Sequence, residues 1–65
     1  MHELTRRETE VAGLVSQGLA NKVVAAQLRV TEGTVKTHLY SIYQKLRVSN
    51  RVGLILRANE SRALA

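Results

Sequence analysis

A polar face runs through the middle of the sequence, and its residue types suit hydrogen bonding to a partner. Lys36, Thr37 and Tyr40 lie close together between Gly33 and Gln44. An ammonium, a hydroxyl and a phenol supply donors and acceptors that can pair with those on the base edges of a nucleic acid. The short residues at the start of this face let another surface approach closely. This combination favours a binding surface over a catalytic centre.

The same segment has an apolar stripe that predicts how the polar face is held. Val35, Leu39, Ile42 and Leu46 follow one another at steps of four, three and four residues. This spacing predicts a helix over 32–46 with one buried side. At about 100° per residue the polar face falls almost opposite the stripe. A helix held to its domain by the stripe would therefore present the polar face outwards.

Two shorter helices are predicted before this one. Thr5 and Glu8 form a capping box, which predicts a helix over 6–17 that ends near Gly18. We assign Thr5 and Glu8 to capping alone. A helix over 21–28 follows after a short connection.

The helices over 21–28 and 32–46 form a helix-turn-helix pattern. Few residues separate them, Thr31 is a good N-cap for the second, and the small Ala25 allows the two helices to cross closely. In this motif the N-terminal part of the second helix reads base edges in the major groove of DNA, while neighbouring groups hold phosphates.

The candidate DNA contacts divide into two sets. Lys36, Thr37 and Tyr40 are the candidate base readers, because they lie on the polar face near its N-terminal end. His38 and Tyr43 flank the apolar stripe and are expected to support the core. The candidate phosphate contacts are Asn21, Lys22, Thr31, Thr34, Lys45 and Arg51.

A fourth helix is predicted over 51–60, capped by Ser49 or Asn50. Its apolar residues fall on two faces, with Leu54 and Ala58 nearly opposite the others. A small domain can cover one of these faces, and a second apolar face indicates a partner, most simply another copy of the chain. The predicted dimer contacts are Val52, Ile55, Leu56 and Asn59.

Length and composition set further limits. The 65 residues make one domain over 1–65, and the absence of cysteine excludes disulfides and thiolate metal sites. His2 and His38 are far apart, so neither a metal site nor any cofactor is expected. The sequence shows no run long enough to span a membrane and no signal-peptide pattern, which predicts a cytoplasmic protein without a membrane partner.

The charge indicates a polyanionic partner. Ten Lys and Arg residues against five Glu give a formal net charge of +5 and a pI near 10.5. Such a balance points towards a nucleic acid, and a protein bound to DNA would be associated with the nucleoid.

The sequence gives little support to an enzyme. It contains no aspartate, no Gly-rich phosphate loop, and no serine, histidine and carboxylate in a plausible relation. Two other function classes stay open. One is a sigma-factor region-four-like module that works with RNA polymerase, against which the second apolar face of the fourth helix argues. The other is a protein-binding helical adaptor whose basic face binds an acidic partner.

Four pieces of the sequence together resemble a known family. They are LTRRETEV, GLANKVVAAQL, TVKTHLYSIYQKL and VSNR, and they occur in the order and spacing of the DNA-binding domains of LuxR/FixJ-type (NarL-like) bacterial transcription regulators. The resemblance covers residues 4–56. It implies an all-α, four-helix bundle-like domain with a helix-turn-helix and no wing. It also implies binding to double-stranded DNA as a homodimer, with the third helix in the major groove and the fourth at the dimer contact.

The resemblance also implies further partners, and the sequence departs from the family pattern at Ala20, Val23 and Arg47. Family members usually carry an upstream receiver or sensor domain, and RNA polymerase is a further implied partner. Ala20 stands where the family usually has a serine or threonine cap, so Asn21 is expected either to take over the cap or to contact a phosphate. Arg47 stands where glycine is frequent, so we expect a positive φ at this position.

Overall fold

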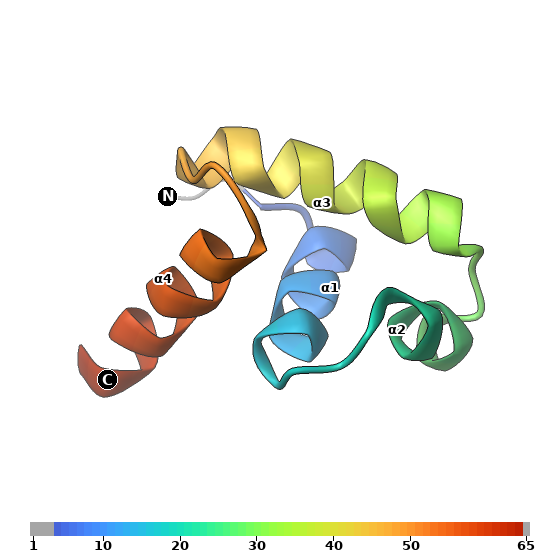
Figure 1. Ribbon diagram of the computed structural model, residues 1–65, viewed down its shortest axis with the longest axis horizontal. Coiled ribbons are helices and arrows are strands. Elements are labelled where there is room, and N and C mark those ends of the chain that lie inside the picture. Colours follow the sequence, from blue (N-terminus) through green and yellow to red (C-terminus); the bar gives the residue numbers. More distant parts are fainter. Residues whose placement is uncertain (1–3, 65) are drawn as a thin grey trace.

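Within residues 4–64 the fold consists of four helices, of which α3 lies across the other three (Figure 1). The computed structural model describes the backbone of residues 4–64 and the side chains of residues 4–60, so His2 and both ends of the predicted domain lie outside the described residues. The helices are α1 (Arg6–Ser16), α2 (Asn21–Leu28), α3 (Glu32–Leu46) and α4 (Arg51–Leu64). Residues 4–64 contain no β-strand, which confirms the all-α class without a wing.

Helix α1 begins at the predicted cap. Thr5 Oγ1 accepts a hydrogen bond from the Glu8 N–H at 3.1 Å, and Glu8 Oε1 accepts one from the Thr5 N–H at 2.9 Å. The helix ends at Ser16 with Gln17 as its C-cap, one residue earlier than predicted. Gly18 has a φ of 91°, the left-handed conformation expected of a glycine that ends a helix.

Helix α2 begins without a side-chain cap. Ala20 occupies the N-cap position, and its methyl group cannot accept a hydrogen bond. The expectation that Asn21 takes over this cap is therefore wrong: Asn21 is the first residue of the helix, and its side-chain oxygen accepts a hydrogen bond from Arg51 instead.

Helix α4 is longer than predicted. Of the two candidate caps, Asn50 fills the role, since its Oδ1 accepts a hydrogen bond from the Gly53 N–H at 3.0 Å. The helix continues to Leu64, four residues beyond the predicted end at 60. The reason is local, because no glycine or proline follows Glu60 to stop it.

Two arginines end helices in the left-handed conformation. Arg47 has a φ of 58°, which confirms the expectation for a residue that stands in place of glycine. Arg29, at the end of α2, has a φ of 59° and was not anticipated. Each of these backbones closes the turn that leads to the next helix.

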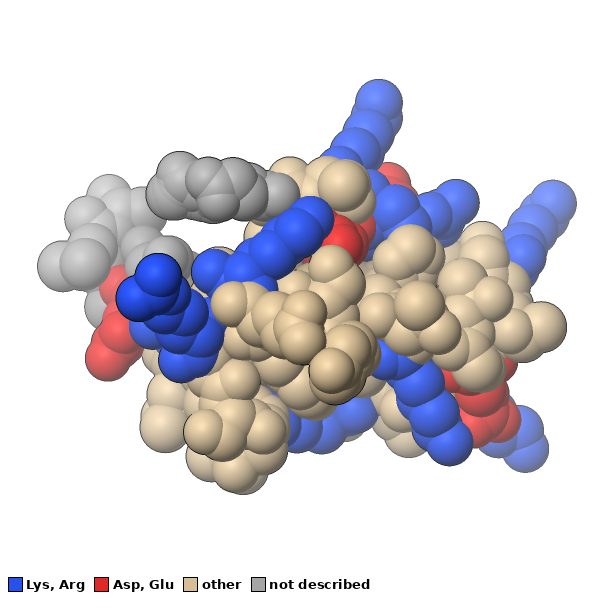
Figure 2. Space-filling view, turned by 90° about the horizontal axis from the view of Figure 1, so that it is seen from above, with Lys and Arg blue, Asp and Glu red and all other residues tan. Residues whose placement is uncertain are grey.

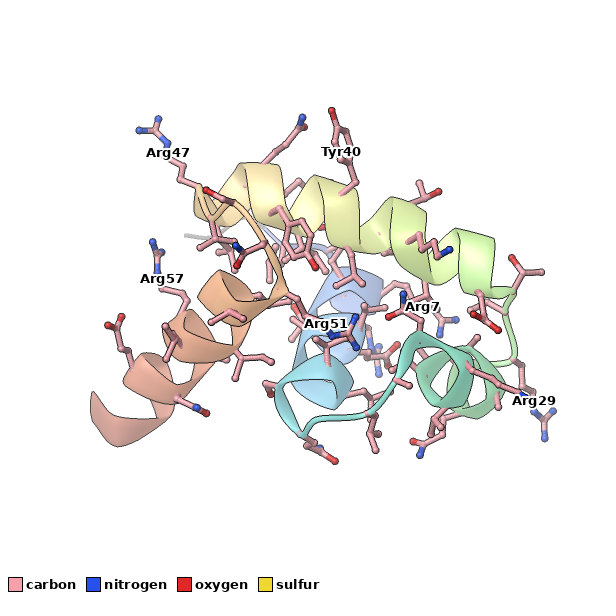
Figure 3. The ribbon with its side chains drawn as sticks, viewed as in Figure 1. Arg7, Arg29, Tyr40, Arg47, Arg51 and Arg57 are labelled. Atoms are coloured by element: carbon pink, nitrogen blue, oxygen red, sulfur yellow. The ribbon has the colours of Figure 1, made fainter. Side chains whose placement is uncertain are left out.

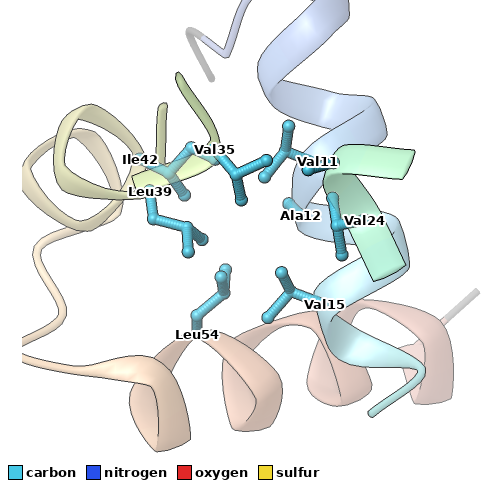
Figure 4. Packing of buried hydrophobic residues seen from close by; sticks show 9 residues of the cluster. Val11, Ala12, Val15, Val24, Val35, Leu39, Ile42 and Leu54 are labelled. Atoms are coloured by element: carbon cyan, nitrogen blue, oxygen red, sulfur yellow. The ribbon is translucent and has the colours of Figure 1, made fainter. Parts of the chain in front are cut away.

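The core gathers around α1, which packs against α2, α3 and α4 (Figure 4). All four helices contribute to it, so the stripe of α3 is covered as predicted. Leu54 of α4 is 1% exposed and closes one side of the core. The buried residues are Val11, Ala12, Val15, Val24, Ala25, Val35, Leu39, Ile42 and Leu54. None of the helices within residues 4–64 has the length and the apolar character needed to cross a membrane.

Candidate nucleic-acid interface

The polar side of α3 is an exposed surface that none of the described side chains of the other helices covers. We call this surface the outer face; its members Gly33, Lys36, Thr37, Tyr40 and Gln44 are all exposed. Tyr40 is 66% exposed and projects away from the domain (Figure 3). The Thr37 hydroxyl donates to the Gly33 carbonyl at 3.0 Å, so Thr37 offers its methyl group and an acceptor to a partner.

The first flank of the outer face carries a shallow groove between α3, α2 and α4. Its volume is about 270 Å³, and it brings together candidate base readers and candidate phosphate contacts that lie far apart in the sequence. Tyr43 forms part of its wall and also packs partly buried against the core, in line with the supporting role assigned to it. The lining residues are Asn21, Lys36, Leu39, Tyr40, Tyr43 and Arg51.

Arg51 lines this groove and makes two short hydrogen bonds. Its Nη1 donates to Asn21 Oδ1 at 2.7 Å, and its Nη2 donates to the Leu19 carbonyl at 2.6 Å. The structure therefore brings the two candidate phosphate contacts Arg51 and Asn21 together, and they bond to each other. The predicted phosphate contact of Arg51 stays a prediction. A phosphate bound there would have to share the guanidinium donors with Asn21 and the Leu19 carbonyl.

The second flank of α3 is fixed to α1 by the carboxylate of Glu8, which is 5% exposed. Lys45 Nζ donates to Glu8 Oε1 at 2.8 Å, and the Ser41 hydroxyl donates to Oε2 at 2.8 Å. Lys45 is the largest cause that lowers the pKa of Glu8 from 4.5 to about 2; Thr5 and Ser41 also lower this pKa, while burial opposes them. The assignment of Glu8 to capping alone is wrong.

The remaining candidate phosphate contacts lie around the two helix starts. Lys22 is exposed and Asn21 half-buried beside the first N–H groups of α2. Thr31 caps α3 by accepting from the Thr34 N–H at 3.1 Å, and the two hydroxyls lie 3.0 Å apart. The predicted cap at Thr31 is confirmed, and both hydroxyls border the N-terminal end of the outer face.

Basic side chains lie on two sides of this surface (Figure 2). Figure 2, which looks down onto α3, shows Lys and Arg projecting on both sides of a central strip of uncharged residues. Four of the five members of the outer face are uncharged, namely Gly33, Thr37, Tyr40 and Gln44. If α3 lay in the major groove of DNA, the charged side chains would face the phosphates on the two sides of the groove. The hydrogen-bonding groups of the outer face would face the base edges.

The outer surface of α4 bears two exposed apolar side chains. Val52 is 63% exposed and Leu56 is 58% exposed, with the exposed Asn59 near them on the helix. Ile55 is half-buried against the core and so contributes less to this surface than predicted. We call the group of Val52, Leu56 and Asn59 the α4 patch.

Sequence reasoning missed the long-range partners of Glu8, although a signal was present. Glu8 occupies a position on the same stripe of α1 as Val11 and Val15, three and seven residues later. A carboxylate on a buried stripe requires partners, because an unpaired buried charge is costly. Ser41 and Lys45 lie four residues apart, so they are neighbours on one flank of α3 and can both contact a single carboxylate.

Two helices joined by a short turn, the second presenting an exposed polar face, define a helix-turn-helix domain. Residues 2–58 match the family described as bacterial regulatory proteins, luxR family. The chain belongs to this luxR family and is a luxR-type DNA-binding domain of transcription regulators. The luxR family is a family of regulators and not of enzymes.

Similar proteins are themselves regulators. The chain is 46% identical over 54 residues to the monoamine regulon transcriptional regulator of Klebsiella aerogenes, covering 83% of this chain and 24% of that protein. It is 44% identical over 55 residues to the HTH-type transcriptional regulator MalT of Vibrio campbellii, covering 85% of this chain and 6% of that protein.

A solved structure has the same fold. The crystal structure of the response regulator ChrA of a heme-sensing two-component system superposes with a TM-score of 0.84 at 45% identity, covering 95% of this chain and 31% of that one. The chain thus spans less than a third of the length of each of these three proteins.

Proposed function

We propose that the chain binds a specific DNA sequence as a homodimer, with α3 in the major groove. The observation that carries this proposal is the outer face of α3, with Lys36 and Tyr40 exposed beside the groove that also holds Asn21. An α-helix fits the major groove, where base edges offer a distinct pattern of donors and acceptors.

Within this proposal the base readers have separate roles. Lys36 donates to guanine O6 or N7, and the methyl group of Thr37 contacts a thymine methyl. Tyr40 reaches the bases with its phenol, since its side chain is 66% exposed and projects away from the domain (Figure 3). Gly33 allows the start of α3 to sit close to the DNA.

The phosphate contacts lie on either side of the readers. The free N–H groups at the start of α2, with Asn21 and Lys22, suit one phosphate, because a helix N-terminus attracts anions. Thr31 and Thr34 suit another at the start of α3. Lys45 and Arg51 complete the proposed set, where each would share its donors with an internal acceptor.

The dimer forms through α4 in this proposal. The α4 patch exposes apolar area on the helix side away from Leu54, which is buried in the domain. Two copies that meet there would place two α3 helices on two half-sites of one duplex, as two-fold DNA-binding proteins do.

Two further partners belong to the proposal. We assign control of the domain to an upstream receiver or sensor domain, and its output to RNA polymerase at a nearby promoter. Transcription from a template that carries the selected site, measured with and without the chain, tests the second assignment. An unchanged transcript level would contradict it.

Selection of bound sites from a random DNA pool tests the central proposal. We expect a motif with two inverted half-sites at a fixed spacing. A titration with random duplex at low salt comes first, and absence of binding there would favour a protein-binding adaptor. Binding only in the presence of RNA polymerase, without self-association, would favour a sigma-like module.

A further inference from the structure

The side chain of Arg51 connects α4 to the start of the helix-turn-helix. Arg51 is the first residue of α4, and its two bonds reach Asn21 and the Leu19 carbonyl, 30 and 32 residues earlier in the chain. Figure 3 shows Arg51 pointing inwards between α4 and α2, whereas Arg57 of the same helix points away from the domain.

The position of α2 and α4 explains why such a connection matters. The two helices lie on opposite sides of α1, and each packs against α1 (Figure 1). The apolar contact of α4, made through Leu54 and the half-buried Ile55, is non-directional. A planar guanidinium bonded to two acceptors fixes a direction as well as a distance.

We infer that Arg51 is a positioning residue that couples the α4 patch to the DNA-binding helices. By fixing the start of α4, it sets the direction of Val52 and Leu56 relative to α3. In a dimer that direction determines how far apart the two α3 helices lie, and so which half-site spacing is bound. This inference rests on the proposed function, because it requires that α4 joins two copies of the chain.

The decisive variant is Arg51→Lys. Lysine keeps the positive charge, so it can still contact a phosphate, but it lacks the planar fork that serves two acceptors. Arg51→Gln removes the charge as well. Arg57→Gln is the matched control, because it removes the same charge from an exposed site on the same helix.

The full chain is titrated with three duplexes built from the selected site. One holds both half-sites, one has a half-site scrambled, and one has the half-sites moved apart by one base pair. We expect Arg51→Lys to lose less affinity for the single half-site, where only the proposed phosphate contact of Arg51 is affected, than for the duplex with both half-sites. The extra affinity gained from the second half-site should fall by about tenfold, a typical size for coupling between sites. The preference for the selected spacing should be lost, while Arg57→Gln should keep both properties.

Other outcomes would overturn the inference. Unchanged cooperativity and spacing preference in both Arg51 variants would exclude coupling. An equal loss on all three duplexes in Arg51→Gln, with a shallower salt dependence and rescue by Arg51→Lys, would make Arg51 a phosphate contact. Loss of helix content by circular dichroism in both variants would make its role purely structural. If the unsubstituted chain binds two half-sites without cooperativity, both the proposed dimer and this inference fail.

Discussion

The carboxylate of Glu8 lies 2.8 Å from the ammonium of Lys45, although 37 residues separate them in the chain. The same carboxylate completes the capping box with Thr5 and accepts from Ser41. One buried side chain therefore joins the start of α1 to one flank of α3. The outer face is held at a defined angle because α3 is fixed there by polar bonds as well as by its apolar stripe.

The stability of the domain should fall in acid because of Glu8. Its pKa is lowered from 4.5 to about 2 in the folded chain, so the unfolded chain binds more protons between these values. The stabilisation is complete above about pH 4.5 and is lost as the pH falls towards 2. Lys45 is one-third exposed (34%) and screened by water, so we expect a loss of about 2 kcal/mol rather than the full value of the shift.

Urea unfolding of the chain between pH 6 and 2 measures this loss. Glu8→Gln should be less stable at neutral pH and should lack most of the decline between pH 4.5 and 2. Glu10→Gln is the matched control, since Glu10 is exposed on the same helix. An equal acid decline in Glu8→Gln and the unsubstituted chain would contradict the assignment.

Lys36 and Lys22 should respond differently to removal of their charge. Lys36→Ala should cost roughly 1–3 kcal/mol of binding and relax the preference at one base pair, because it removes a base contact. Lys22→Ala should weaken binding to all sequences and reduce the salt slope by about 0.9, because it removes a phosphate contact. Titrations with the selected site and its single-base variants separate the two effects. A uniform loss for Lys36→Ala would make Lys36 a phosphate contact.

Gly33 should matter for DNA binding and not for folding. A Cβ at Gly33 would meet, within the described part of the chain, only Thr31 Oγ1 at 3.7 Å, an ordinary contact. Gly33→Ala should therefore raise the free energy of unfolding by up to about 1 kcal/mol. It should weaken DNA binding, because the added methyl group would keep the start of α3 further from the DNA.

Gly13 supplies the control for this substitution. A Cβ there meets none of the described residues within 4 Å, and Gly13 lies on α1, away from the outer face. Gly13→Ala should stabilise the chain by about 0.5–1 kcal/mol and leave its DNA affinity unchanged. Equal affinities of the two variants in a fluorescence titration would show that nothing approaches Gly33 closely.

Leu56 and Leu54 should separate association from folding. Leu56 is 58% exposed, so Leu56→Ala should change the free energy of unfolding by no more than about 0.5 kcal/mol. It should also reduce the number of chains bound to a two-half-site duplex, measured by sedimentation. Leu54→Ala should destabilise the fold by about 2–5 kcal/mol, since Leu54 is 1% exposed. Undiminished pairing in Leu56→Ala would exclude the α4 patch as the dimer contact.

The sequence by itself determined the local structure of this protein. The capping box of Thr5 and Glu8 and the cap at Thr31 depend on residues within about four positions, where side chain and backbone meet regardless of the rest of the fold. The left-handed backbone at Arg47 was expected because glycine is frequent at this position in the family that the sequence resembles. Helical periodicity likewise separated the buried stripe of α3 from its outer face. The luxR family could be inferred from the order and spacing of these pieces.

Only the tertiary structure decided which distant groups meet. The partners of Glu8 on α3 and of Arg51 near α2 lie 30 or more residues away, and their choice depends on how the helices cross. A helical wheel gives the direction of a side chain from its own helix but not the position of the next helix. For that reason Glu8 was expected to cap only, and Asn21 was expected to cap or bind phosphate, whereas packing made both of them acceptors between helices.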